Sequence, residues 1–334
     1  MAVTLTIIAI GLAGRALNPV FVNDQLELLE FSARWQWVYD EQMPVYAWIS
    51  TALLRLSGDS VLALDALKYL WVGGMLMALA GIAERLRPGS GVIAIAFAFL
   101  LPTVNDDLMG EVSHTAAMMC AGAVSAWLIV RALDGETRRL WLWLGLVWAG
   151  GLAAKHSMIP LVAAEFAAVA LLAGPARARM LRHMVPAAGI MAALCAPLYV
   201  ILAMAPDTVG DQLAEFFTDR GMGGALMDCL TSPLAEAGLL IMGIAGGAAW
   251  KRPAMGRARW VLIAVAAGFI AAIIGGVLLS GATVLRDRWL AAGLVLLAPV
   301  AASMVPRPER WRALAVGLVL AAAAARAAET AGLV

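Results

Sequence analysis

Two acidic residues follow the first apolar stretch of the chain. Asp24 and Glu27 come directly after it, and in a helix they would stand at i and i+3 on one face. A carboxylate supported by a second one is suited to act as a general base that deprotonates a hydroxyl group. The alternative is that Asn23 or Asp24 caps the start of a solvated helix. The spacing alone leaves both interpretations open.

The loop that contains these acids, residues 23–49, is both acidic and aromatic. Besides Asp24 and Glu27 it contains three acids, Glu30, Asp40 and Glu41. Its aromatic residues are Phe31, Trp35, Trp37, Tyr39, Tyr46 and Trp48. The loop is too acidic to cross a bilayer and too apolar to be a free linker. We expect short helices in the membrane interface, with Pro44 starting one of them and carboxylates such as Glu41 facing a cavity. An aromatic belt with a turn is the alternative.

A second polar turn, residues 104–114, adds Asp106, Asp107, Glu111 and His114. On a helix the last three stand at i, i+4 and i+7 and form one stripe. Carboxylates with an imidazole could bind a divalent cation or ligand hydroxyl groups. Capping by one of the aspartates is the alternative, but it does not explain the other two residues.

Basic residues in apolar surroundings are candidates for anion binding. They are Lys68, Lys155, Arg286 and Arg288. A charge inside a membrane span is costly and is usually functional, although Lys68 could simply pair with Asp65 at i−3. A guanidinium grips phosphate through two hydrogen bonds, whereas an ammonium acts as a point charge. We expect Lys155 and one of the two arginines to bind an anion, although Asp287 between the arginines could form a surface ion pair with them.

The elements that carry these residues are predicted to be membrane helices. The 334 residues are 63% hydrophobic with a mean hydropathy of +0.86, far above the roughly 45–50% apolar content of soluble domains. We expect an all-α, polytopic helix bundle that forms one integral membrane domain over 1–334, with the catalytic loops in 1–175 and spans that complete the cavity in 176–334. Segments of about 20 apolar residues lie near 2–18, 59–83, 90–105, 112–132, 139–155, 158–174, 184–204, 233–250, 259–281, 289–305 and 312–330.

The charges are distributed unevenly between the loops. A net charge of +1 argues against nucleic acid as a partner. Five loops, at 84–89, 131–139, 175–183, 251–259 and 306–312, hold 15 of the 24 basic residues but only four of the 23 acids. Because Lys and Arg are retained in the cytoplasm, these loops are predicted to be inner ones. The N-terminus would then be cytoplasmic, and all the candidate residues above would lie on the outer side.

The polar pattern of the first loop resembles a known family. Asp24 and Glu27, then Tyr39 fifteen residues after Asp24, then Gln42-x-Pro44-x-Tyr46-x-Trp48 resemble the first outer loop of GT-C membrane glycosyltransferases. The most similar group is that of the rhizobial lipopolysaccharide galacturonosyltransferases, with the lipid A aminoarabinose transferases more distant. The segments around 104–114, 151–155 and 285–290 also resemble family segments. Two residues depart from the pattern: Gln25 replaces its second acid and Met43 its first proline.

The resemblance implies an enzyme of the bacterial inner membrane whose active site faces the periplasm. It would be an inverting glycosyltransferase that moves a sugar from a polyprenyl-phosphate donor to a hydroxyl group of a lipid, glycan or protein acceptor. Membrane lipids would be its other partners. Asp24 would be the catalytic base and Glu27 the second acid.

The other candidate residues are assigned to substrates or a metal. The residues expected to bind substrate are Tyr39, Glu41, Gln42, Asp106, Asp107, Glu111 and His114. Those expected to bind the donor phosphate are Lys155, Arg286, Arg288 and Lys68. A divalent cation, Mg²⁺ or Mn²⁺, could be held by Asp107, Glu111, His114 and Glu41.

Two alternatives remain at the level of sequence. Charged residues clustered in a membrane also mark transport pathways, so a transporter or flippase of a lipid-linked or anionic substrate is one. A non-catalytic protein that binds lipid-linked sugar, suggested by Gln25, is the other. The sequence does not identify the sugar or the acceptor.

Overall fold

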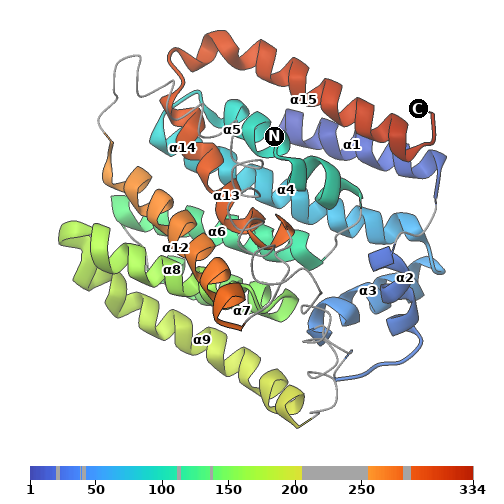
Figure 1. Cartoon of the computed structure of the whole chain (residues 1–334), viewed down its shortest axis with the longest axis horizontal. Helices are drawn as coiled ribbons and strands as arrows, with labels where there is room; N and C mark the ends of the chain where they lie inside the picture. The colour runs from blue at the N-terminus through green and yellow to red at the C-terminus, as the bar shows by residue number, and fades with distance from the viewer. Residues whose placement is uncertain are drawn as a thin grey trace.

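The computed structural model describes residues 1–19, 23–37, 39, 43–110, 114–135, 138–204, 255–280 and 287–333, without the side chains of 23, 24, 138 and 287. The regular elements in these ranges are helices (Figure 1). They are α1 (Ala2–Leu17), α2 (Asn23–Ser32), α3 (Pro44–Ser57), α4 (Val61–Leu86), α5 (Gly91–Phe99), η1 (Thr103–Leu108), α6 (His114–Asp134), α7 (Arg138–Ala154), α8 (Met158–Leu172), η2 (Gly174–Ala176), α9 (Arg177–Ala203), α12 (Arg257–Ser280), η3 (Asp287–Trp289), α13 (Ala291–Val295), α14 (Leu297–Met304) and α15 (Pro308–Thr330).

The predicted all-α membrane bundle is confirmed, but not the number of eleven spans. Five described segments are long and apolar enough to cross a membrane: α4, α6, α9 with its preceding turn, α12 and α15. Four shorter apolar segments are α1, α7, α8 and the α13–α14 pair. The predicted span at 233–250 lies outside the described residues.

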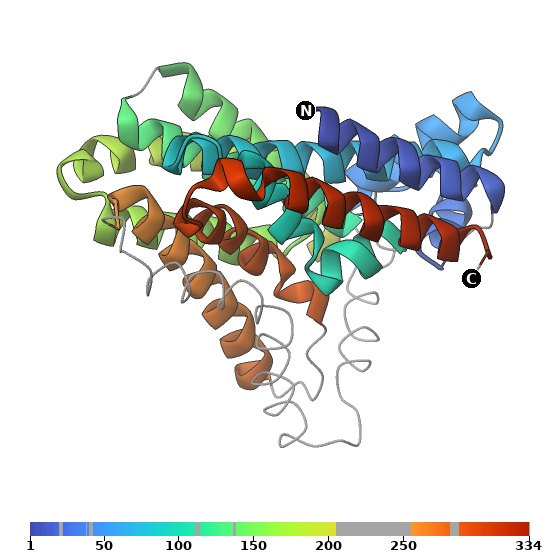
Figure 2. The same ribbon diagram turned by 90° about the horizontal axis from the view of Figure 1, so that it is seen from above.

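The helices pack in two layers (Figures 1 and 2). One layer runs in the order α15, α1, α4, α6, α7 and α9, each helix in contact with the next. The second layer contains α5 and α14, which pack on α4, and α8 and α12, which pack on each other. The short helices α2 and α3 pack together beside α4, so the first loop folds into two short helices as expected.

Two predicted spans are broken rather than continuous. The segment predicted at 90–105 is the nine-residue helix α5, which ends at Phe99 and is followed by the π-helix η1. Pro102 stands between them, and proline disfavours the helical conformation of the residue before it. The segment predicted at 289–305 consists of η3, α13 and α14. π-Helical turns are rare in proteins, and those that occur are often at functional sites. The outer turn at η1 is therefore a candidate part of the site.

The predicted inner loops meet at one end of the bundle, here called the inner end. Arg85 on α4 pairs with Asp134 at the end of α6, with 3.0 Å between Nε and Oδ2. Arg259 on α12 donates to the Ser303 hydroxyl over 2.9 Å and to the carbonyl of Leu86 over 3.0 Å. These contacts join loops that are distant in the sequence but were all predicted to lie on the same side.

The predicted outer loops meet at the opposite end, here called the outer end. The Asn18 side chain donates to the carbonyl of Thr330 over 3.0 Å, and Arg326 on α15 donates to the carbonyl of Asp106 in η1, also over 3.0 Å. The predicted alternation of the helices therefore agrees with the contacts between them. Which end faces the cytoplasm stays a prediction.

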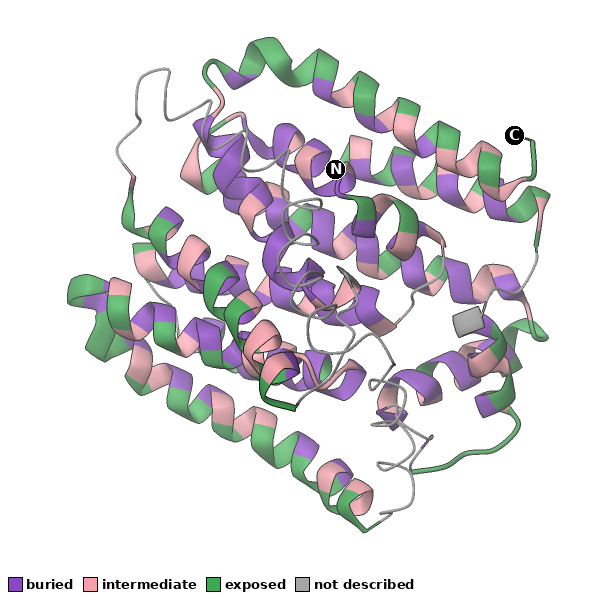
Figure 3. Cartoon of the chain, viewed as in Figure 1, coloured by how far each residue is buried: buried purple, intermediate pink, exposed green. Residues whose placement is uncertain are grey.

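The surface of the bundle suits a hydrocarbon environment. Figure 3 shows buried residues in its middle and exposed ones along α9 and α15. Many exposed side chains are large and apolar, including Leu279 at 91% and Leu171 at 78% exposure. Inside, small residues allow close contact: a Cβ at Gly14 on α1 would stand 2.8 Å from the backbone of Ala327 on α15, as is common between membrane helices.

Candidate functional site

The helix that carries Asp24 and Glu27 is anchored by a buried polar network. Arg15 at the end of α1 pairs with Asp65 on α4 over 2.8 Å and donates to the Gln25 side chain over 3.0 Å. The Gln25 amide in turn donates to Asp65 over 2.8 Å. All three side chains are at most 4% exposed, so paired polar groups connect the start of α2 to α1 and α4.

Lys68 belongs to this network, and its role at the donor phosphate stays a prediction. Its ammonium lies 3.2 Å from the Asp65 carboxylate and donates to the carbonyls of Met109 and Gly110 over 3.1 and 3.2 Å. An ammonium has three donors, and these acceptors match them in a side chain that is fully buried. The ion pair between Lys68 and Asp65, which the sequence left open as an alternative, is present in the structure. It supplies the partner that a buried charge needs.

Tyr39 was predicted to bind substrate, and in the structure its side chain is held inside the first loop. Its side chain is 2% exposed, and its ring lies 4.9 Å from that of Phe31. Its hydroxyl donates to the carbonyl of Arg34 and accepts from the N–H of Gln36, each over 2.9 Å. Trp48 holds the same loop, since its Nε1 donates to the carbonyl of Gln36 over 2.7 Å. Tyr39 therefore stabilises the loop from within.

The two proposed acids lie on α2, as their spacing predicts. Because α2 covers Asn23–Ser32, Asp24 and Glu27 are one helical turn apart. Glu27 is half-buried and takes part in a polar interaction. The side chain of Asp24 lies outside the described residues, so its role stays a prediction, as do the roles of Glu41, Gln42, Glu111 and Arg286.

The second outer turn is not the continuous helix on which its predicted stripe was based. Asp106 and Asp107 lie in the π-helix η1, and His114 begins α6 after a gap in the described residues. Asp106 is exposed and lies in a pocket with Arg326 and Glu329 of α15. Asp107 is half-buried. Within the described residues, no three His, Cys, Asp or Glu side chains could hold a metal together, so the metal prediction depends on Glu41 and Glu111.

Three of the predicted residues do come together at the outer end. His114 starts α6, Lys155 follows the end of α7, and Arg288 lies in η3, which packs against η1 and α13. Among the described residues, Lys155 and Arg288 are cations that act electrostatically on His114. The Lys155 ammonium donates to the hydroxyl of Thr115 over 2.8 Å, next to His114 in the chain. The result is a cluster that places two basic side chains near His114.

Arg288 has a buried donor for which the described residues supply no acceptor. Its Nε is inaccessible to solvent and makes no hydrogen bond there. A buried polar group without a partner costs roughly 1–3 kcal/mol and calls for an explanation in terms of a ligand, an ion or water. An anion bound beside Lys155 and Arg288 would satisfy this donor.

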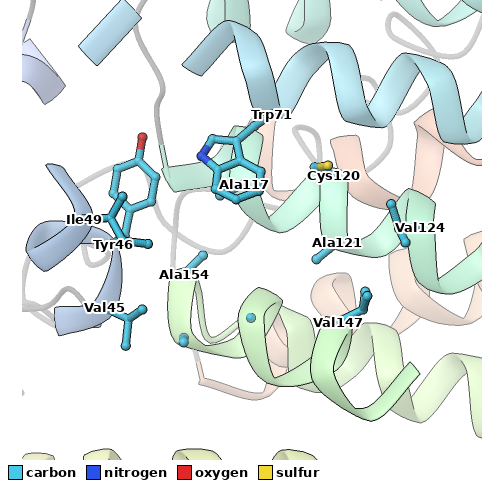
Figure 4. Close-up of a pocket in the computed structure, with 12 residues that line it drawn as sticks. Val45, Tyr46, Ile49, Trp71, Ala117, Cys120, Ala121, Val124, Val147 and Ala154 are labelled. Atoms are coloured by element: carbon cyan, nitrogen blue, oxygen red, sulfur yellow. The ribbon is translucent and has the colours of Figure 1, made fainter. Parts of the chain in front are cut away.

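An apolar cavity of about 230 Å³ lies next to this cluster (Figure 4). It is lined by residues of α3, α4, α6 and α7, namely Val45, Tyr46, Ile49, Trp71, Ala117, Cys120, Ala121, Val124, Val147, Gly150, Ala153 and Ala154. Tyr46 connects it to the cluster, because its ring lies edge-on to that of His114 with 6.4 Å between centroids. Ala154 directly precedes Lys155. The apolar cavity therefore lies beside the polar cluster of His114, Lys155 and Arg288.

A buried acid between the spans was not singled out from the sequence. Glu165 on α8 is fully buried and accepts hydrogen bonds from the hydroxyl of Ser125 on α6 and from Nε1 of Trp148 on α7. Arg15 was missed in the same way, and Gln25 was named only as a departure from the family pattern. The signal that could have found Glu165 and Arg15 is a single charged residue in an otherwise apolar span, where its cost demands partners.

Known proteins resemble this chain in sequence. A model of the dolichyl-phosphate-mannose-protein mannosyltransferase family matches residues 41–202, just under half of the chain. The chain is 25% identical over 296 residues to the lipopolysaccharide core galacturonosyltransferase RgtB of Rhizobium johnstonii, covering 81% of this chain and 58% of RgtB. It is 29% identical over 131 residues to RgtA of the same organism, covering 37% of this chain and 26% of RgtA. The chain thus spans less than two thirds of these relatives.

The fold also resembles a solved one. The crystal structure of ArnT from Cupriavidus metallidurans bound to undecaprenyl phosphate matches 94% of this chain and 62% of ArnT, with a TM-score of 0.69 and 12% sequence identity. The likeness in fold is therefore much stronger than that in sequence. Together the comparisons confirm the predicted resemblance to this group of GT-C membrane glycosyltransferases.

Proposed function

We propose that this chain is an inverting glycosyltransferase that uses a polyprenyl-phosphate sugar as donor. It would transfer the sugar to a hydroxyl group of a lipid, glycan or protein acceptor at the outer end of the bundle. Support comes from the similarity to RgtB, from the mannosyltransferase family match and from the fold shared with an ArnT that was solved with undecaprenyl phosphate. These relatives are named as transferases or bind a polyprenyl phosphate, so the transporter alternative gains no support from them.

One observation in the structure itself carries the proposal: two cations, Lys155 and Arg288, lie near an apolar cavity. Lys155 and Arg288 act electrostatically on His114, and the Arg288 Nε lacks an acceptor among the described residues. A polyprenyl phosphate has the complementary form, a doubly charged phosphate group on an apolar chain. The phosphate would be bound by these cations, while the first prenyl units would enter the cavity below Tyr46.

The chemical step follows from this placement. Asp24 would take the proton of the acceptor hydroxyl as its oxygen attacks the anomeric carbon of the sugar. The bond between that carbon and the phosphate oxygen breaks, and the polyprenyl phosphate leaves as an anion. Because the leaving group is already anionic, its stabilisation by fixed cations should contribute more than a general acid. Lys155 and Arg288, with Arg286 as a further candidate, would supply it.

The proposed orientation is that of a bacterial inner-membrane protein with a cytoplasmic N-terminus and a site that faces the periplasm. The basic loops that meet at the inner end support it. A metal is a separate part of the proposal. The two described candidates, Asp107 and His114, do not form a site by themselves, and the cations beside His114 disfavour a divalent ion there. No step above depends on a metal, and transfer in excess chelator would test for one.

The decisive experiment is transfer in vitro from a panel of polyprenyl-phosphate sugars. We expect Asp24→Asn to lower the rate by about 10²–10⁴-fold, the usual contribution of general base catalysis, with donor affinity little changed. Glu30→Gln is the matched control, because Glu30 is an exposed acid of the same helix. Wild-type turnover in Asp24→Asn would remove Asp24 as the base. Flux of a lipid-linked sugar across sealed vesicles without a glycosidic product would favour a transporter instead.

A further inference from the structure

A second cavity lies at the inner end of the bundle, between α7 and α9. Its volume is about 760 Å³. It is lined by Arg139, Trp141, Leu142, Arg182, His183, Pro186, Ala187 and Ile190, hereafter the inner groove. This groove lies at the opposite end of the molecule from the outer cluster, and neither the proposed reaction nor the comparisons assign it a role.

The two parallel helices beside the groove, α7 and α9, come into close contact at one level. A Cβ at Gly145 of α7 would stand 2.7 Å from the carbonyl oxygen of Ala187 on α9, so the backbones are close at that level. One turn nearer the inner end, the contact is instead the stacking of Trp141 on His183, with 5.5 Å between centroids and 15° between ring planes. Both rings belong to the lining of the groove.

The polar lining of the groove is entirely basic. Arg139 lies in the first turn of α7 and Arg182 in the second turn of α9. Both are exposed, and within the part of the chain that the structure describes neither guanidinium has a hydrogen-bond or ion-pair partner. His183 adds an imidazole beside them. In contrast, Arg85 at the same end is neutralised by Asp134.

The apolar lining continues from these charges toward the middle of the bundle. Leu142 is 51% exposed, and Pro186 and Ile190 follow one another on α9 at helical spacing. A ligand of this groove therefore needs a negatively charged head followed directly by a hydrocarbon chain. Basic pockets between helices at the cytoplasmic side of a membrane have this form when they bind anionic lipid headgroups.

We propose that the inner groove is a binding site for an anionic phospholipid of the surrounding membrane. Its phosphate accepts hydrogen bonds from Arg139 and Arg182, for which the planar guanidinium is suited, and one acyl chain lies along Leu142, Pro186 and Ile190. The charge of the groove matches a phosphatidylglycerol headgroup, which carries a negative charge, and not a zwitterionic phosphatidylcholine. This inference does not depend on the proposed transferase activity.

Lipid binding can be measured by native mass spectrometry of the detergent-solubilised protein titrated with phosphatidylglycerol. We expect one tight adduct, whose affinity falls by about tenfold or more when both arginines are removed in Arg139→Ala/Arg182→Ala. The matched control is Arg87→Ala/Arg310→Ala, which removes the same charge from the inner end but outside the groove. Leu142→Glu, at an exposed position that bears little packing, should also lose the adduct by repelling the phosphate.

Three results would overturn the proposal. Equal losses in the groove variant and the control would mean diffuse attraction by the basic end. Phosphatidylcholine with the same acyl chains binding as tightly would remove the role of charge. Glycerol phosphate competing at the same concentration as the lipid would show a site for soluble anions, because the chain would then contribute nothing.

Discussion

The side-chain amide of Gln25 bridges Arg15 and Asp65 inside the bundle. It donates to the Asp65 carboxylate over 2.8 Å and accepts from the Arg15 guanidinium over 3.0 Å. An amide can do both, whereas a carboxylate has no donor and an ammonium has no acceptor. Glutamine, which replaces the acid of the family pattern at position 25, therefore suits a position between one donor, Arg15, and one acceptor, Asp65.

Replacing Gln25 by glutamate, the kind of residue that the family pattern has there, should reduce stability at neutral pH. The variant places a carboxylate oxygen against Asp65 in place of a donor, and a lost buried hydrogen bond costs about 1–3 kcal/mol. The deficit should shrink as the pH falls, because the introduced carboxyl group, once protonated, can donate to Asp65 again. Thermal unfolding in detergent as a function of pH measures this.

The control for that variant is Gln25→Ala, which removes the bridge without adding a titrating group. Its loss of stability relative to wild type should not depend on pH in the same range. If Gln25→Glu were as stable as wild type at neutral pH, the amide bridge would not be what holds α2.

Lys155 and Lys68 should respond differently to removal of their charge. Lys155→Met should raise the KM for a polyprenyl-phosphate donor by about tenfold or more, as expected when a charged contact to a ligand is lost, with little change in unfolding temperature. Lys68→Met should instead destabilise the protein by about 3–5 kcal/mol, since it leaves the buried Asp65 with one partner fewer. Donor kinetics and thermal unfolding of both variants distinguish the two roles. A raised KM in Lys68→Met with a loss of stability in Lys155→Met would mean that Lys68 binds the donor and Lys155 is structural.

Filling the apolar cavity should discriminate between donors by the length of their prenyl chain. A Cβ at Gly150 of α7 meets nothing within 4 Å, although the residue lines the cavity. Gly150→Leu should therefore occupy the cavity without strain, lowering kcat/KM for long-chain donors more than for short-chain analogues. Gly317→Leu is the matched control, because Gly317 on α15 is equally unobstructed but does not line the cavity. Equal effects on donors of both lengths would place the prenyl chain elsewhere.

Glu165 should act as a structural junction between α6, α7 and α8. Glu165→Leu leaves the Trp148 N–H without its acceptor and should cost about 1–3 kcal/mol of stability. The double variant Glu165→Leu/Trp148→Phe should be less destabilised than the sum of the two single variants, because the unsatisfied donor is then absent, although the smaller ring leaves a cavity at the buried position 148. A double-mutant cycle based on unfolding measures this coupling. Additive effects of the two substitutions would show that the hydrogen bond contributes nothing.

Apolar length and loop charge were sufficient to predict most of the fold. Helices occur at ten of the eleven expected segments, and the contacts of Arg85 and Arg326 join the loops that the basic residues had grouped. The end of α5 before Pro102 and the π-helical turn that follows were not expected, because the segment was predicted from its apolar length and the effect of the proline on the preceding residue was not taken into account. The division into α13 and α14 has no comparably strong sequence signal.

The candidate site was predicted in part. His114, Lys155 and Arg288 were named from residue type and position, and the structure brings them together. Lys68 and Tyr39 were assigned to ligands, but each is satisfied by neighbours that only the folded chain supplies, namely the carbonyls of Met109 and Gly110 and the backbone of residues 34–36. Sequence can mark a costly buried charge, but it does not show which acceptors will surround it.

The contact of α1 with α15 has a consequence for biosynthesis. Asn18 and Thr330, whose hydrogen bond joins these helices, are 312 residues apart in the chain. During translation α1 enters the membrane long before α15 exists, so its Gly14 face must stay against lipid or a chaperone until α15 arrives. Loss of α15 should therefore expose α1, a helix far from it in the sequence, to membrane quality control.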